Sequence, residues 1–387
     1  MFHLLTLSPL AFFTVNPSAP QRNLFIFLEI FSCEGGIQSY VKDVLAAYEQ
    51  WPQAPRADVF LLRDGSQTLP QESAGPLRFH SFASPWALVG RLRLGLALVL
   101  ALSYHRPQQV ICGHVLLLPL VAPLCRWWRV PYVVMIYGKE VWDPQPPRIQ
   151  RALQQADQIW ANSRYSRDRA CAANPINPDR VRMLTCVVDS DNFCPGPADP
   201  ALVAAYGLEN HLVLMTVARL WSGDIYKGVD VTIRALPTIA QAFPQVKYLV
   251  IGRGDDQPRL AALAEELGVA DRVVFAGFVP TEKLADHYRL ADAYVMPSQE
   301  GFGIVYLEAL ACGVPVLSGD RDGSADPLQD GRLGWRVPHR DVDAVTAACI
   351  EMLQGTDPRC RGDWLRAETL AQFTFPVLAE RLRVALS

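Results

Sequence analysis

The chain has 387 residues, half of them hydrophobic and 19% charged, and its formal net charge is -3. This length suits two domains, each large enough to bury most of its apolar surface. The composition excludes a disordered chain, and the small net charge gives no general attraction to nucleic acid. Nine cysteines without a Cys-x-x-Cys pair favour reduced thiols in a cytoplasmic protein over disulfides or a zinc site.

Two apolar segments bear on location. Residues 1–22 form an N-terminal extension without a basic start or a clear cleavage site, so a signal peptide is not predicted. No uncharged apolar run is long enough to span a bilayer. Trp86–Ser103 is rich in Leu and contains Arg91 and Arg93. It is either a buried helix with two surface arginines or a basic amphipathic helix in peripheral contact with the inner face of the cell membrane.

Residues 23–195 alternate short runs rich in Val, Ile and Phe with segments of helical periodicity, which predicts a Rossmann-like domain around a parallel sheet. Helices are expected between most strands, for example at Ile37–Trp51 and Pro147–Ala156. Asp189–Pro200, with three prolines and a glycine, is the expected linker. The predicted strands are Leu24–Ile30, Ala57–Leu62, Leu77–Phe82, Gln109–Gly113, Tyr132–Tyr137, Gln158–Ala161 and Arg182–Val188.

The same pattern restarts in residues 196–372, which predicts a second Rossmann-like domain. Two doubly wound α/β units in series would face each other across a cleft, with ligands at the carboxyl ends of their strands. Residues 373–387 are expected to form a final helix. The predicted strands of this half are His211–Val217, Val246–Ile251, Arg272–Ala276, Ala293–Met296 and Val314–Leu317. Its predicted helices are Val229–Ala242, Pro258–Leu267, Thr281–Leu290 and Ile304–Ala311.

The segment from Glu300 to Glu308 is the most informative motif. Gly301 and Gly303 flank Phe302 where a strand passes into a helix near Ile304. A helix N-terminus of this kind offers unpaired N–H groups and a positive dipole end to an anion or to sugar hydroxyls. Glu300 at the cleft lip could stabilise positive charge at an anomeric carbon, and Glu308 could hold ribose hydroxyls. A helix-start carboxylate would explain Glu300 equally well, but it leaves Glu308 among apolar neighbours unexplained.

Weaker motifs stand at three other strand ends. Gly252 and Gly254 permit close approach to a phosphate or base, and so does Gly36 in Glu34-Gly35-Gly36, although plain turns explain both motifs. The missing third glycine after Gly254 argues against a nicotinamide cofactor. Arg219 and Lys227 could clamp a diphosphate or be solvated surface charge.

His114 ends one predicted strand, and Tyr137-Gly138-Lys139-Glu140 ends another. A lone histidine at a strand end is more often structural than catalytic. The Asp-x-Asp triplets at residues 189–191, 320–322 and 341–343 are treated as chance, so no metal site is predicted.

Together these motifs resemble the retaining glycosyltransferases of family 4, which have the GT-B fold. The resemblance rests on the Glu-x7-Glu pair around Gly-Phe-Gly, on Arg219 with Lys227-Gly228, on Ile251–Gly254 and on Glu34-Gly35-Gly36. It runs from about Leu24 to the C-terminus and is dense from Val217 to Gly334.

The resemblance implies a UDP- or GDP-sugar donor held mainly by the second domain, without an essential metal or cofactor. Arg219 and Lys227 would bind the diphosphate, Glu308 the ribose, and Glu300 with the backbone of residues 301–304 the sugar. Gly36 would meet the phosphate from across the cleft, and the final helix would cross back to the first domain. The leaving diphosphate would help to deprotonate the acceptor, with electrostatic help from the protein.

The sequence departs from the family pattern at two places. Many members have a histidine facing the sugar where Tyr137 stands, so the acceptor-side candidates are Tyr137, His114 and Glu140. The usual Asn-Gly-Val-Asp appears here as Cys186-Val187-Val188-Asp189.

The expected activity is transfer of a hexose, mannose or glucose, to a glycan or lipid-linked acceptor. A nucleotide-sugar epimerase of the same architecture and a non-catalytic sugar-binding protein remain as alternatives, and product analysis with a labelled donor separates the epimerase from a transferase.

Overall fold

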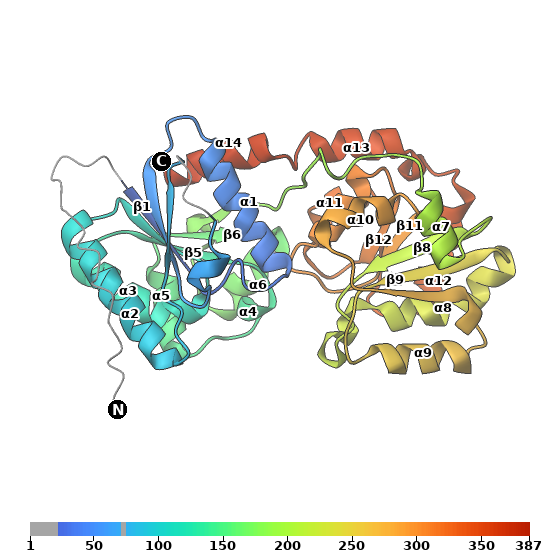
Figure 1. Ribbon diagram of the computed structural model, residues 1–387, viewed down its shortest axis with the longest axis horizontal. Coiled ribbons are helices and arrows are strands. Elements are labelled where there is room, and N and C mark those ends of the chain that lie inside the picture. Colours follow the sequence, from blue (N-terminus) through green and yellow to red (C-terminus); the bar gives the residue numbers. More distant parts are fainter. Residues whose placement is uncertain (1–21, 71–74) are drawn as a thin grey trace, which may run out of the picture.

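The computed structural model describes residues 22–70 and 75–387, so the predicted N-terminal extension lies outside the described residues except for Arg22. The described chain forms two α/β units, each built around one parallel sheet (Figure 1). The predicted architecture of two doubly wound Rossmann-like sheets, the GT-B fold, is confirmed. All strand pairs in both sheets are parallel. The inner strands are almost fully buried because helices cover both faces, whereas the edge strands β3, β7 and β10 are only partly buried.

The first sheet has seven strands in the order β3-β2-β1-β4-β5-β6-β7. The order reverses between β1 and β4, and ligands of doubly wound folds bind at such a switch point. Its strands are β1 (Arg22–Phe27), β2 (Arg56–Leu61), β3 (Leu77–Ser81), β4 (Gln109–Cys112), β5 (Tyr132–Ile136), β6 (Gln158–Ala161) and β7 (Val181–Met183). Its helices are α1 (Gly36–Gln50), α2 (Ala87–Leu100), α3 (Leu118–Trp128), α4 (Lys139–Trp142), α5 (Pro147–Gln155) and α6 (Arg164–Ala173).

β7 ends five residues before the predicted strand does. The apolar residues that follow it are buried against α1, and the Tyr40 hydroxyl donates to the Leu184 carbonyl at 2.5 Å. The apolar run therefore reflects burial under a helix, which a strand pattern alone does not distinguish from pairing in a sheet.

The second sheet has six strands in the order β10-β9-β8-β11-β12-β13. The sequence prediction missed the three-residue strand β13, which is too short to show a clear pattern. The strands are β8 (Leu212–Val217), β9 (Val246–Ile251), β10 (Val273–Gly277), β11 (Ala293–Met296), β12 (Val316–Gly319) and β13 (Trp335–Val337). The helices are α7 (Pro200–Tyr206), α8 (Val229–Ala242), α9 (Gln257–Glu266), α10 (Thr281–Tyr288), α11 (Ile304–Ala311), α12 (Val342–Gln354) and α13 (Gly362–Leu370).

The last helix, α14 (Phe375–Leu386), lies against the first unit beside α1 (Figure 1). The Phe373 carbonyl accepts a hydrogen bond from Val188 N at 2.9 Å, and the Leu386 carbonyl accepts one from Gln109 Nε2 at 3.2 Å. The last helix of the chain therefore lies on the first unit, and α13 and α14 bridge the two units.

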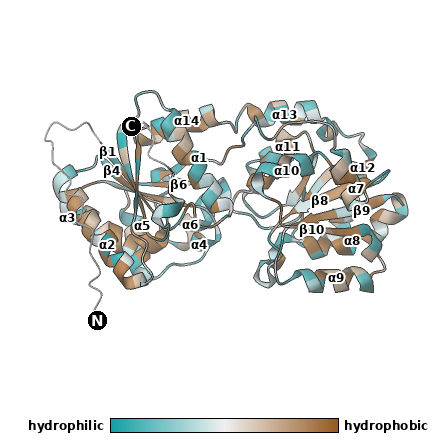
Figure 2. Ribbon diagram, viewed as in Figure 1, coloured by the Kyte–Doolittle hydropathy of each residue, from teal (hydrophilic) through white to brown (hydrophobic). Residues whose placement is uncertain are grey.

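α2 continues through a π-helical turn, η2 (Ala101–His105), and packs with α3 on one face of the first sheet. By length and composition alone, Ala87–His105 could cross a membrane, although 28% of its apolar window is buried in the protein. Leu94, Leu98 and Leu102 are fully buried in the core of the first unit. The other side of α2 is exposed and mostly apolar, with Arg91 and Arg93 among its exposed residues (Figure 2). Because one face packs in the core, a spanning arrangement would take the helix out of the fold.

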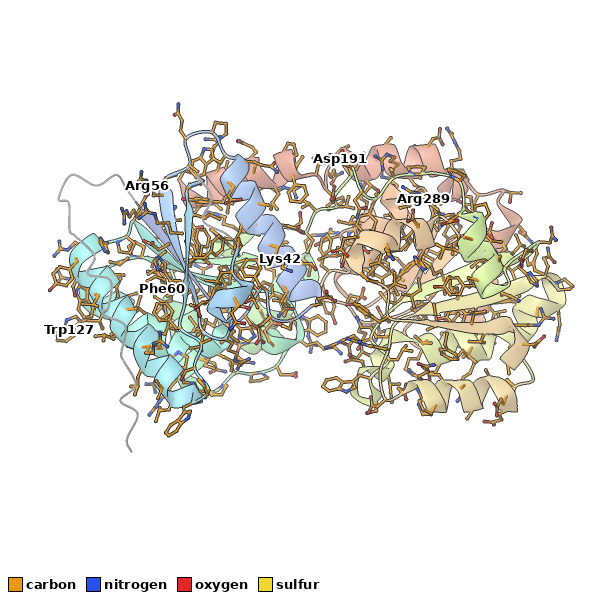
Figure 3. The ribbon with its side chains drawn as sticks, in the orientation of Figure 1. Lys42, Arg56, Phe60, Trp127, Asp191 and Arg289 are labelled. Atoms are coloured by element: carbon orange, nitrogen blue, oxygen red, sulfur yellow. The ribbon has the colours of Figure 1, made fainter. Side chains whose placement is uncertain are left out.

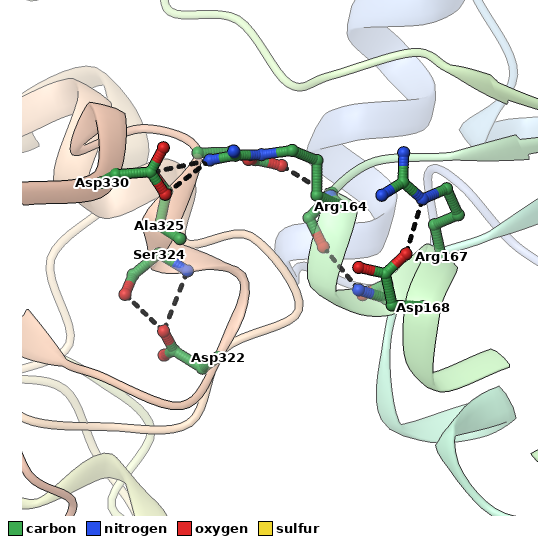
Figure 4. A network of polar contacts seen from close by, with 10 residues as sticks. Arg164, Arg167, Asp168, Asp322, Ser324, Ala325 and Asp330 are labelled. Carbon is green, nitrogen blue, oxygen red and sulfur yellow. Dashed lines mark hydrogen bonds and ion pairs between the residues drawn. The ribbon is translucent and has the colours of Figure 1, made fainter. Parts of the chain in front are cut away.

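The two units also meet directly at the start of α6. The Arg164 guanidinium pairs with Asp326 and, at 2.8 Å, with Asp330, both beyond β12 (Figure 4). The Arg164 backbone N–H also donates to Asp326, at 2.7 Å. The Ser166 hydroxyl donates to the Gly301 carbonyl at 3.2 Å. These contacts hold the first unit against the loop that contains Glu300.

Candidate active site

The loop after β11 carries Glu300 and leads into α11, which begins at Ile304. The Glu300 side chain is 15% exposed, and its Oε1 atom lies 2.5 Å from Lys227 Nζ. The Ser298 hydroxyl donates to the same oxygen at 3.2 Å. The first N–H groups of α11 have no partner within the helix and carry its positive dipole end. The loop therefore gathers a carboxylate, an ammonium group and a helix N-terminus.

Lys227 ends the 3-10 turn η5 (Ser222–Lys227), and Gly228 turns the chain into α8 with a φ of +76°. A Cβ atom at Gly228 would lie 2.7 Å from the Pro297 carbonyl oxygen, so only glycine lets these two loops approach. Burial by itself would lower the pKa of Lys227, but the Glu300 carboxylate raises it above its usual value. Lys227 is therefore held as a cation.

Arg219 follows β8 and is 65% exposed, and its Nη2 atom lies 2.8 Å from Asp224 Oδ2. Arg219 and Lys227 line the same small pocket. A forked guanidinium beside an ammonium group can neutralise and orient a diphosphate. The structure therefore places the two predicted cations at one pocket and pairs one of them, Lys227, with Glu300.

Glu308 lies on the first turns of α11 and is 8% exposed. The Tyr288 hydroxyl donates to its Oε2 atom at 2.7 Å. Burial raises the pKa of Glu308 to about 7, against the lowering effect of this hydrogen bond. On α1 of the other unit, burial raises the pKa of Asp43 to about 8, and the negative charge of Glu308 acts in the same direction. A buried carboxylate that costs free energy to ionise is typical of a functional site.

Asp322 belongs to one of the three Asp-x-Asp triplets, for which the sequence predicts no function. Its carboxylate accepts the Glu300 backbone N–H at 2.7 Å and the Ser324 backbone N–H at 2.9 Å. Burial raises its pKa to about 7. Asp322 therefore fixes the backbone of Glu300, a role that depends on the folding of β12 beside β11. Among the described residues, no three His, Cys, Asp or Glu side chains form a metal-ligating group.

The glycines near the site have specific packing roles. Cβ atoms at Gly252 and Gly254 would lie 1.8 Å from the carbonyl oxygens of Ala218 and Leu220. These two glycines thus let the β8 and β9 loops pack together, and their contact with a donor stays a prediction. A Cβ atom at Gly301 would lie 2.2 Å from the Tyr137 carbonyl oxygen in the other unit.

Two further donor-site candidates lie close to this loop. Gly303 has a φ of +92° and stands directly before α11. The Phe302 side chain is buried and packs edge-on against Phe373, with ring centroids 6.0 Å apart. Any contact of Phe302 with a donor must therefore come from its backbone, as it would for Gly303.

On the first unit, α1 begins at Gly36, where a Cβ atom would meet no other atom within 4 Å. The start of α4 brings Lys139 across to the second unit, with its Nζ atom 2.8 Å from the centroid of the Tyr226 ring. Burial lowers the pKa of Lys139, and Glu300 and Asp224 act in the opposite direction. The sequence prediction missed Lys139, because only the contact between the units brings it to Lys227 and Glu300.

The acceptor-side candidates each have a structural partner. The Tyr137 hydroxyl donates to the Gly113 carbonyl at 2.6 Å, and His114 Nδ1 accepts the Leu116 N–H at 3.2 Å. Glu140 Oε1 accepts the backbone N–H of Tyr137 at 2.5 Å and that of Gly138 at 3.1 Å. Glu140 thereby shapes the turn that carries Lys139. A part for these three side chains in acceptor chemistry stays a prediction.

The chain is similar to known proteins in sequence and in fold. Residues 211–355 match the family model for glycosyl transferases group 1. The chain is 32% identical, over 84% of its own length and 87% of the relative, to a GDP-mannose-dependent alpha-(1-6)-phosphatidylinositol monomannoside mannosyltransferase of Mycolicibacterium smegmatis. It is 35% identical to a D-inositol 3-phosphate glycosyltransferase of Mycobacteroides abscessus, over 51% of this chain and 45% of the relative.

A solved structure from Anabaena in complex with UDP has the same fold, with a TM-score of 0.76. The two chains are 20% identical, and the match covers 95% of this chain and 99% of the other. This likeness shows the fold and not the donor. The match to the Mycolicibacterium smegmatis relative, by contrast, covers most of both chains at 32% identity. The chain therefore belongs to the glycosyl transferases group 1, family 4, and is a glycosyltransferase of GT-B fold.

Proposed function

We propose that this glycosyltransferase moves a mannosyl residue from GDP-mannose to a lipid-linked acceptor, with retention of anomeric configuration and without an essential metal. The observation that carries the proposal is the pairing of Lys227 with Glu300 at the N-terminus of α11. It places positive charge where a diphosphate would leave and negative charge where an anomeric carbon would become cationic. Two relatives that match most of this chain are named as GDP-mannose-dependent mannosyltransferases, so we prefer GDP-mannose over UDP-glucose as the donor.

The proposed reaction uses electrostatic stabilisation in a site that is already assembled. Lys227, Arg219 and the free N–H groups of α11 would stabilise the departing GDP, and Glu308 would accept hydrogen bonds from the ribose hydroxyls. Glu300 would stabilise the positive charge that develops on the sugar. The leaving phosphate would take the proton of the acceptor hydroxyl on the same face. The two side-chain cations supply charge that a metal ion supplies in other nucleotide-sugar enzymes, which supports a metal-independent reaction.

We further propose that the enzyme works at the cytoplasmic face of a membrane. The support comes from α2 and the residue before it, because the side chains of Trp86, Leu88, Leu92 and Leu96 are more than half exposed. An exposed apolar row of this size is typical of a contact surface. The same helix has Arg91 and Arg93 exposed, which suits anionic headgroups.

The donor can be tested by thermal shift against GDP-mannose, GDP-glucose, UDP-glucose and UDP-galactose, since a true donor stabilises the folded protein. We expect the largest shift with GDP-mannose, and a larger shift with UDP-glucose would overturn the choice of donor. Transfer from labelled GDP-mannose to a membrane lipid extract, with and without a chelator, tests the reaction. Nuclear magnetic resonance of the product gives its anomeric configuration, and release of free or epimerised sugar alone would contradict a transferase.

The Glu300→Gln variant separates catalysis from binding, because it keeps the shape of the side chain and removes its charge. Turnover should fall by about 100-fold or more, while the dissociation constant for GDP changes by less than about threefold. Unchanged turnover would exclude the catalytic assignment of Glu300.

A further inference from the structure

α3 and α5 lie side by side on the part of the first unit away from the second unit (Figure 1). A groove of about 540 Å³ is lined by residues of these two helices. Its floor is apolar and includes Ala122 and Ala152, and its rim carries Arg126, Arg148 and Arg151. In α5, Arg148, Arg151 and Gln155 recur at helical spacing and so share one face. One face of each helix is therefore open to a ligand that is partly apolar and partly anionic.

The three guanidinium groups at this groove are not neutralised by acids. Arg126 donates to the neutral Gln155 side chain, and no ion pair of Arg148 or Arg151 with a carboxylate occurs in residues 22–70 and 75–387. The sequence around the groove has the same bias, since residues 73–139 contain six arginines and one lysine but no Asp or Glu. In a protein with a net charge of -3, this long acid-free stretch marks one positively charged region.

The groove also adjoins an exposed apolar surface. α2 packs on α3, and Gly95 of α2 lies beside the Leu120 side chain of α3. Trp127 lines the groove, is 81% exposed and extends from the edge of the molecule (Figure 3). Exposed tryptophan beside arginine is favoured at the boundary between lipid headgroups and acyl chains.

We propose that the groove between α3 and α5 binds the anionic headgroup of a bilayer phospholipid, with Trp127 and the apolar row of α2 entering the interface beside it. The proposal deepens the membrane-side function proposed above and rests on it for its biological setting. Arg126, Arg148 and Arg151 would contact the phosphate, and the apolar floor would cover the glycerol end of one lipid. A free soluble anion could contact the arginines of the rim, but it would leave Trp127 and the apolar row of α2 exposed to water.

The test is flotation of the full chain with vesicles of phosphatidylcholine containing about 30% phosphatidylglycerol, compared with pure phosphatidylcholine vesicles. We expect clear binding only to the anionic vesicles, and a loss of binding as salt is raised. Arg148→Gln and Arg151→Gln should each weaken the partition about fivefold, since each removes one cation from the surface. Arg234→Gln is the matched control, because Arg234 is an exposed helical arginine of α8 in the other unit.

A second measurement distinguishes a groove from a diffuse charged surface. Dihexanoyl-phosphatidylglycerol, titrated below its micelle concentration, should quench tryptophan fluorescence with saturation at one lipid per protein, and Trp127→Phe should remove most of this signal. Equal vesicle binding by the Arg151→Gln and Arg234→Gln variants, or titration without saturation, would overturn the proposal. The thermal shift with GDP-mannose is measured on every variant. A variant that loses lipid binding can then be told from one that misfolds, and the lipid result is separate from the test of the donor.

Discussion

Replacing Glu308 by glutamine should stabilise the protein and weaken donor binding at the same time. The carboxylate is buried in the second unit, and burial raises its pKa from 4.5 to about 7. The glutamine side chain would keep the shape and could still accept the Tyr288 hydrogen bond through its amide oxygen, but it cannot ionise. The substitution therefore removes the free-energy cost of ionising a buried group and leaves the packing of α11 unchanged.

The sign and size of this effect follow from proton linkage. Between pH 4.5 and about 7 the folded protein binds more protons at Glu308 than the unfolded chain does, so the free energy of unfolding falls as pH rises. Above pH 7 the wild type carries the full cost, which at 1.36 kcal/mol per pKa unit is about 3 kcal/mol. For a unit of this size that corresponds to a rise in Tm of about 6–12 °C in Glu308→Gln at pH 8. At pH 5, where most of the unfolded chain is already ionised at this residue, the difference should shrink to about a quarter of that value.

The assay is calorimetry of wild type and variant from pH 5 to pH 8.5, together with the dissociation constant for GDP. Loss of charge-assisted hydrogen bonds to the ribose should weaken GDP binding about tenfold or more. Glu265→Gln on α9 is the control, since Glu265 is exposed and its replacement should shift Tm little at any pH. A gain in Tm that is equal at pH 5 and pH 8 would refute the burial argument, and unchanged GDP binding would refute the ribose assignment.

Three other substitutions test the site and the contact between the units. Lys227→Met removes a cation held 2.5 Å from Glu300, and we expect kcat/KM for the donor to fall by about 100-fold or more. Arg164→Ala removes the pairing with Asp326 and Asp330 between the units. Because the units are then held together less firmly, X-ray scattering should show a larger radius of gyration, and KM for the donor should rise about two- to fivefold. Tyr137→Phe deletes the hydrogen bond to the Gly113 carbonyl and should cost about 1 kcal/mol of stability, with turnover nearly unchanged.

Each of these variants has a control or a contradicting outcome. Lys283→Met changes an exposed lysine of α10 and should leave kcat/KM at the wild-type value. Arg167 pairs with Asp168 inside α6 (Figure 4), so Arg167→Ala should not change the radius of gyration. A Tyr137→Phe enzyme that folds normally but loses turnover would show that the phenol acts on the acceptor.

Much of the fold was predictable because parallel strands buried on both faces are short, apolar and rich in β-branched residues. β6, β9 and β11 were predicted with their observed bounds. Two strand predictions failed, for different reasons. The residues after β7 are apolar because α1 covers them, and β13 is too short to be told from a loop.

The sequence by itself determined which residues stand at the carboxyl ends of the strands, because strand, turn and helix alternate locally. In this way Arg219, Lys227 and Glu300 could be assigned to one edge of the second sheet before their contacts were known. Only the tertiary structure decided what each side chain faces. The Tyr137 hydroxyl lies against Gly113, Asp322 holds the Glu300 backbone, and Lys139 reaches Tyr226 in the other unit. These contacts join residues up to about ninety positions apart, and they depend on strand order and on the docking of two units, which local sequence patterns do not specify.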